Sequence, residues 1–135
     1  MTYRLKNIPL YCHVGKKRFH FNLNHYRNAH YQVLNRAKRW FEGWVLIQNT
    51  KAKRFKTPVE IHYQFWLTRK SDLMNYGAVV DKFLQDALIK KRIIQDDNVD
   101  IVKHISFDFC GYDKVGRASV EVRQWKGAAE IRRTF

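Results

Sequence analysis

The sequence is poor in the residues that mark several common classes of small protein. Its two cysteines, Cys12 and Cys110, lie far apart, so we expect free thiols and not a disulfide scaffold. The six histidines and Cys12 lack the spacing of a zinc site, and neither a glycine-rich phosphate loop nor a nucleophile elbow is present. No apolar run approaches the roughly 20 residues that a bilayer-spanning helix needs, and residues 1–6 lack the apolar core of a signal peptide. We therefore expect a cytoplasmic protein with one domain over residues 1–135.

Acidic residues are also scarce, and they are distributed unevenly. Residues 1–56 contain 13 Lys and Arg but a single acid, Glu42, whereas residues 57–135 contain 13 Lys and Arg together with 11 acids. The formal net charge is +14. This excess of positive charge predicts a polyanionic partner. Nucleic acid is favoured over an anionic membrane because the cations alternate with Asn, His and aromatic residues, and we expect no small-molecule substrate.

The apolar pattern predicts one α+β domain, a mixed β-sheet with two main helices packed on it. Strands are expected where alternate residues are apolar, at residues 18–23, 57–68, 99–109 and 118–122. Residues 111–116 are expected to form a hairpin loop between the last two strands. One helix is expected from His25 to Val45, capped by Asn24, and another from Tyr76 to Lys91. The predicted order is therefore β-α-β-α-β-β.

Six of the twelve acidic residues lie between Asp72 and Asp100, although the rest of the chain is basic. Asp72 follows the predicted strand at 57–68, and Asp97 lies in the turn expected after the second helix. Mg²⁺ prefers oxygen ligands and is commonly held by one or two carboxylates together with substrate phosphates. A nearby lysine such as Lys82 can stabilise the charge that develops when a phosphodiester is cut. If the turns that flank the helix meet, these residues form a metal-dependent site; the alternative is that they are ordinary caps, turn formers and surface charges.

The order of these residues resembles the RusA family of Holliday junction resolvases, which are largely of phage and prophage origin. That family carries an Asp-x-Asp-Asn motif at a strand end. A helix follows with Lys and, four residues later, Asp-Ala-Leu or Asp-Gly-Leu, and a turn then carries an Asp-Asp pair. The corresponding segments here are Asp72-Leu73-Met74-Asn75, Lys82-Phe83-Leu84-Gln85-Asp86-Ala87-Leu88 and Asp96-Asp97, and residues 23–30 resemble the family's opening Leu-Asn segment. The resemblance covers about residues 20–123.

The resemblance implies a homodimer in a bacterial or phage-infected cell that binds four-way DNA junctions and cuts symmetric strands with Mg²⁺, or with Mn²⁺ in its place. The catalytic residues that it implies are Asp72, Asn75, Lys82 and Asp97. The sequence departs from the family at Met74, where a side chain that cannot ligate magnesium replaces the second motif aspartate. Asp81 is the candidate for the missing carboxylate, so the expected metal ligands are Asp72, Asp81 and Asp97. If Asp81 does not serve, the protein binds junctions without cutting them.

The basic residues expected to contact DNA lie in the first part of the chain and just before Asp72. They are Lys16, Lys17, Arg18, Arg27, Arg36, Lys38, Arg39, Lys53, Arg54, Arg69 and Lys70. Two other interpretations stay open. One is a non-catalytic DNA- or RNA-binding module that uses the basic first part, and the other is a basic structural protein of a phage or ribosome-associated particle. The grouping of the acids favours the nuclease over both.

Overall fold

The computed structural model describes residues 2–48 and 53–127 and contains a mixed four-stranded sheet, a two-stranded sheet and three helices. In chain order the elements are β1 (Thr2–Pro9), β2 (Tyr11–Val14), β3 (Lys17–His20), α1 (Leu23–Asn28), α2 (Tyr31–Ile47), β4 (Val59–Leu67), α3 (Leu73–Lys90), β5 (Val102–Tyr112) and β6 (Arg117–Gln124). The predicted α+β class with a mixed sheet is confirmed. None of the helices formed by these residues is long and apolar enough to span a membrane.

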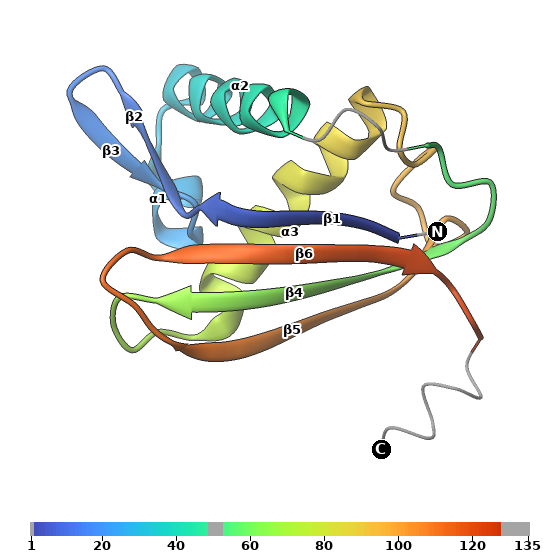
Figure 1. The fold of residues 1–135 in the computed structure, drawn as a ribbon. Helices are drawn as coiled ribbons and strands as arrows, with labels where there is room; N and C mark the ends of the chain where they lie inside the picture. The colour runs from blue at the N-terminus through green and yellow to red at the C-terminus, as the bar shows by residue number, and fades with distance from the viewer. Residues whose placement is uncertain (1, 49–52, 128–135) are drawn as a thin grey trace.

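The four-stranded sheet has the order β1-β6-β4-β5. β4 and β5 run parallel, and α3 is the crossover between them, as a parallel pair requires. β6 runs antiparallel to both β1 and β4. Figure 1 shows that α1, the β2–β3 hairpin and the carboxyl end of β4 lie at one end of the molecule, whereas the loop after α3 lies at the other end.

The predicted hairpin between the last two strands is wrong, because β4 lies between β5 and β6. The segment after β5 instead passes across the end of β4, where the Asp113 N–H donates to the Leu67 carbonyl at 2.9 Å. Alternation of apolar residues identifies a strand but not its neighbours. β4 takes the inner position because its alternate side chains are buried from Val59 to Leu67, and a central strand gains most from such a row.

The amino-terminal segment also differs from the prediction. β1 was not predicted, and its alternation is interrupted by a register shift between Leu5 and Ile8. The predicted strand at 18–23 is only the second half of the β2–β3 hairpin. The apolar pattern of β1 is irregular at the register shift, and β2 and β3 span only four residues each, so periodicity detects all three poorly.

The predicted helix from His25 is two helices, and its cap is Asn22 and not Asn24. The Asn22 side chain accepts a hydrogen bond from the His25 N–H at 2.9 Å, and α1 ends at Asn28. His30 then caps α2 through its Nδ1, which accepts from the Gln32 N–H at 3.2 Å. The next helix, α3, begins at Leu73, three residues earlier than expected. Both cysteines are free, as expected: Cys12 is buried and Cys110 is exposed.

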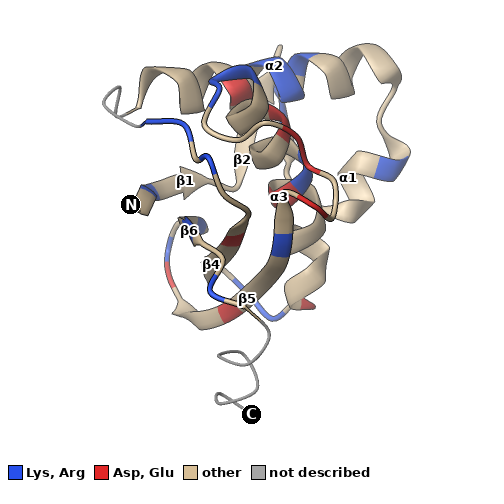
Figure 2. Ribbon diagram, turned by 90° about the vertical axis from the view of Figure 1, so that its right-hand side faces the viewer, with Lys and Arg blue, Asp and Glu red and all other residues tan. Residues whose placement is uncertain are grey.

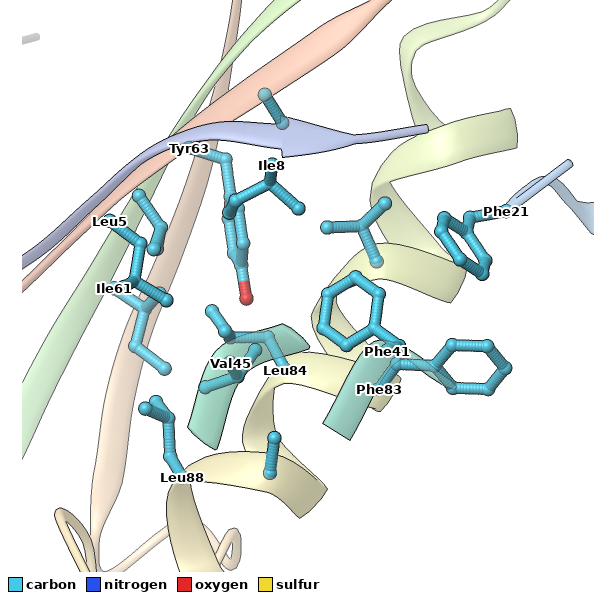
Figure 3. Packing of buried hydrophobic residues seen from close by; sticks show 14 of the residues in the cluster. Leu5, Ile8, Phe21, Phe41, Val45, Ile61, Tyr63, Phe83, Leu84 and Leu88 are labelled. Atoms are coloured by element: carbon cyan, nitrogen blue, oxygen red, sulfur yellow. The ribbon is translucent and has the colours of Figure 1, made fainter. Parts of the chain in front are cut away.

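The core lies between the sheet and the helices α2 and α3. Figure 3 shows Phe41 and Val45 of α2 and Leu84 and Leu88 of α3 facing the side chains of the sheet. Among the residues labelled in Figure 3, Tyr63 of β4 is the one whose side chain ends in a polar atom. It is fully buried, and its hydroxyl extends from the sheet toward the helices. That hydroxyl needs a hydrogen-bond acceptor inside the protein.

Candidate functional site

The acceptor for the Tyr63 hydroxyl is Asp81, in the middle of α3. The hydroxyl donates to Oδ1 of Asp81 at 2.6 Å, and the Gln85 side-chain amide donates to both carboxylate oxygens at 2.9 Å. Gln85 is buried, and Asp81 is itself half-buried. Two side chains therefore fix the orientation of one carboxylate, the arrangement expected of a group that must hold a defined position.

Asp97, in the loop after α3, lies close enough for its charge to act on Asp81. The pKa of Asp81 is raised above its ordinary value, chiefly by burial and also by the negative charge of Asp97, while the hydrogen bonds from Gln85 and Tyr63 oppose the shift. Asp97 is exposed, and its N–H donates to the Asp96 side chain at 2.8 Å. We call Asp81 and Asp97 the carboxylate pair.

Asp72 lies at the other end of α3, where it is the N-cap residue and is exposed. Nine residues separate it from Asp81, which corresponds to about 13 Å along the helix axis. Within residues 2–48 and 53–127, no group of three or more His, Cys, Asp and Glu side chains is arranged to hold a metal ion. The three predicted ligands therefore do not form one cluster: Asp97 acts electrostatically on Asp81, whereas Asp72 lies at the start of α3.

Asn75 has a structural environment at the start of α3. Its side chain donates to the Ser71 hydroxyl at 3.1 Å and accepts from the Leu23 N–H at 3.1 Å, so it joins the first turns of α3 and α1. Met74 is 52% exposed and lines the same cavity of about 440 Å³ as Asp72. The chain is helical from Leu73 onward, so residues 72 and 74 do not share a face as they would on an extended strand.

Lys82 is exposed beside Asp81 on α3, and it has no carboxylate partner in the part of the chain that the structure describes. Asp86, four residues on, pairs instead with Lys38 of α2 at 2.9 Å. The alternative in which Lys82 and Asp86 are only a surface ion pair is therefore wrong. Lys38, predicted to contact DNA, is held between the two helices by this ion pair.

The other predicted DNA contacts are exposed cations. Figure 2 shows Lys and Arg along α2 and acidic residues on the loop that follows α3. Ten residues of the predicted set are exposed: Lys16, Lys17 and Arg18 on the β2–β3 hairpin, Arg27 on α1, Arg36 and Arg39 on α2, Lys53 and Arg54 before β4, and Arg69 and Lys70 after it. The basic charge is thus spread over several elements.

Two residues of the site were not predicted from the sequence, Tyr63 and Gln85. A signal existed for each. Tyr63 places a hydroxyl on the apolar face of a buried strand, and Gln85 follows Asp81 by four residues, the spacing at which helical side chains meet. Neither signal specifies the partner, because the approach of β4 to α3 is a tertiary contact.

The chain matches no protein-family model, and no curated protein matches it. The resemblance to RusA resolvases therefore rests on the residues named above.

Proposed function

We propose that the protein is a magnesium-dependent endonuclease that resolves four-way or branched DNA junctions by paired phosphodiester cuts. The carboxylate pair supports this proposal. Asp81 is half-buried, oriented by two donors and within electrostatic reach of Asp97, in a protein whose formal net charge is +14. The charge of Asp97 adds to the cost of ionising the half-buried Asp81, and a bound cation would offset that cost.

The donor chemistry of the pair fits Mg²⁺ or Mn²⁺. One or two carboxylates completed by substrate phosphates are a common protein contribution to a magnesium site, so Asp81 and Asp97 are sufficient without Asp72. Such an ion supplies positive charge to the phosphate oxygens while the bond to the leaving oxygen breaks. Tyr63 and Gln85 keep Asp81 in place. Lys82, the next residue on α3, is exposed and would be the group that adds a second positive charge. Asp72 and Asn75 then belong to the start of α3, where Asn75 supports the fold.

The proposal includes a homodimer, and the free edge of β5 suits a second copy of the chain. β5 is the last strand of its sheet and pairs on one side only. Three apolar side chains on it are exposed, Ile105 at 38%, Phe109 at 48% and Tyr112 at 61%. Antiparallel pairing of two β5 strands about a two-fold axis would bond the free edge and cover these side chains. Sedimentation of the wild type and of a Phe109→Lys variant tests this interface, with dissociation of the variant expected.

A non-catalytic nucleic-acid-binding protein is the second candidate, and one observation favours it. Asp72 lies apart from the carboxylate pair, and Met74 replaces a motif aspartate, so the site has fewer acids than the RusA pattern contains. The two candidates differ in their response to Mg²⁺. Incubation with a synthetic four-way junction and with linear duplex, with and without Mg²⁺, supports the nuclease if only the junction is cut and only with Mg²⁺. Binding without cleavage, together with no heat of Mg²⁺ binding in a titration, supports the second candidate.

A further inference from the structure

A second charged feature is a cavity of about 280 Å³ at the carboxyl end of β4, at the end of the molecule opposite the loop that carries Asp97. We call it the β4-end cavity. Four elements, β2, β3, β4 and α3, and three connecting segments contribute to it, and its polar lining residues are Tyr11, Arg18, His20, Thr68, Tyr76 and Lys114. Leu10, Leu67 and Val115 form an apolar part. The predicted DNA contacts do not include Thr68, Tyr76 or Lys114.

The positive groups of this cavity converge from separate parts of the chain. The Arg18 guanidinium lies 4.8 Å from the centre of the Tyr11 ring, which holds it over the cavity wall. The pKa of His20 is lowered by burial first and then by the charges of His25, Arg18 and Arg69. The charges of Arg18 and Arg69 therefore both reach His20, although the two arginines are 51 positions apart in the sequence.

None of the lining residues is acidic, and the nearest acid in sequence is already bonded. Asp113 precedes Lys114, but one of its oxygens accepts from Arg117 at 3.1 Å and the other from the Lys114 N–H at 2.7 Å. Neither Arg18 nor Lys114 forms an ion pair with a carboxylate among residues 2–48 and 53–127, although Lys114 is close enough to Asp113 for their charges to interact. Some cations elsewhere in the fold are paired, as in Arg4–Glu121, Lys90–Glu42 and Arg123–Glu60, so the feature that sets Arg18 and Lys114 apart is their position around one cavity. Unpaired cations around a concave site leave a favourable place for an anion.

We propose that the β4-end cavity binds one phosphate group of a nucleic acid strand, with the attached nucleoside against Leu10, Leu67 and Val115. Arg18 and Lys114 would hold the phosphate oxygens, and Thr68 and Tyr76 can donate hydroxyl hydrogen bonds. The inference deepens the proposed function, on which it rests, by naming the part of the substrate that this end of the protein holds.

The size of the cavity decides which form of nucleic acid enters it. Its volume is close to the lower end of the range of roughly 300 to 1,000 Å³ found for small-molecule sites, which is the scale of one nucleotide and far below that of a duplex. A nucleotide reaches such a cavity only from a single strand or where it has left the base stack. Branched DNA offers unstacked nucleotides at the branch, whereas an intact duplex does not.

The first test adds a negative charge to the cavity at a position where folding is not at risk. Val115 is 60% exposed, so Val115→Glu places a carboxylate at the cavity without disturbing the core. The control is Ile47→Glu, which adds the same charge on α2 at a side chain that is 77% exposed. Fluorescence anisotropy without Mg²⁺ measures binding of a short oligothymidylate. We expect binding to weaken about tenfold for Val115→Glu and less than about twofold for Ile47→Glu. Equal effects of the two variants would overturn the proposal, because the loss would then reflect net charge alone.

The second test removes cations one at a time. Arg18→Gln and Lys114→Gln should each reduce the slope of log K against log salt by about 1, whereas Lys6→Gln, an exposed lysine on β1, should leave it nearly unchanged. Oligothymidylate, linear duplex, free thymidine monophosphate and inorganic phosphate serve as separate probes. The proposal predicts a larger effect of the variants on the single strand than on the duplex, and it is overturned if the duplex is affected equally.

The free-ligand probes separate this inference from the proposed function. One result would support the cavity proposal and contradict the nuclease proposal. In it, thymidine monophosphate or inorganic phosphate perturbs the His20 NMR signals, but the protein cleaves no junction. The opposite result would support the nuclease and contradict the cavity proposal. In it, the Arg18→Gln and Lys114→Gln variants still cleave junctions and bind single strands with unchanged affinity.

Discussion

The carboxylate pair and the β4-end cavity carry opposite charges. They differ in whether their charged groups have hydrogen-bond partners within the protein. The Asp81 carboxylate accepts hydrogen bonds from Tyr63 and Gln85, but its ionised form is disfavoured by burial and by the charge of Asp97. Arg18 and Lys114 border a cavity with no acidic lining residue. A buried acid must be held in place by the fold, because an unsatisfied carboxylate is costly, whereas exposed cations can remain hydrated until an anion arrives. The first region therefore suits a metal ion and the second a phosphate group.

The largest expected effect separates the two regions directly. Asp97→Asn should lower junction cleavage by at least about 100-fold, because it removes half of the carboxylate pair, and should leave junction binding intact or tighter. Asp100→Asn, which changes another exposed acid of the same loop, is the matched control and should keep near wild-type cleavage. Cleavage by gel and binding by anisotropy are the measurements. Undiminished cleavage by Asp97→Asn would show that Asp97 is only a turn residue.

The next effect tests whether Asp81 takes the place of the aspartate that Met74 replaces. Asp81→Asn should lower cleavage about 10- to 100-fold, and raised Mg²⁺ should restore part of it, because a weakened site is refilled by mass action. Met74→Asp should change cleavage little, since Met74 lies about seven residues from Asp81 on α3, or about 10 Å along the axis. Titration of cleavage rate against Mg²⁺ measures both. A strong gain of cleavage in Met74→Asp would instead place the metal at the start of α3.

A smaller effect concerns the packing that supports the carboxylate pair. A Cβ atom at Gly77 would lie 3.0 Å from two ring atoms of Phe107, and Phe107 stacks on Tyr63 with ring centres 5.2 Å apart. Gly77→Ala should therefore destabilise the protein by about 1 kcal/mol despite the better helix propensity of alanine. Gly43→Ala on α2, where the added Cβ meets nothing within 4 Å, should stabilise it by about 0.5 to 1 kcal/mol. Denaturant unfolding measures both. Stabilisation by both variants would show that Phe107 moves aside freely.

The smallest expected effect is the pH dependence that Asp81 contributes to stability. Its pKa is raised in the fold, so the folded protein binds this proton more tightly than the unfolded chain does. The resulting stability is fully present below the ordinary pKa of 3.8 and is lost as the pH rises through the raised value. The difference in Tm between Asp81→Asn and the wild type should therefore grow in favour of the variant as the pH increases above about 4. Thermal unfolding over a pH series measures it, and a constant difference would contradict the burial argument.

The amino-acid sequence by itself determined the fold class, the faces of β4, the existence of α3 and the concentration of acids around it. These features depend on the order of neighbouring residues, since a strand repeats every two residues and a helix about every 3.6. The charge imbalance between residues 1–56 and 57–135 is likewise a property of composition.

Only the tertiary structure decided which strands are neighbours and which acids meet. The insertion of β4 between β5 and β6, the hydrogen bond from Tyr63 to Asp81 and the separation of Asp72 from Asp97 each depend on how distant segments pack. Arg18, His20 and Lys114 reach one cavity for the same reason, because β3 and the loop before β6 meet at the end of β4. Sequence spacing fixes distances along the chain, whereas the burial of apolar surface over the whole domain fixes the distances between its parts.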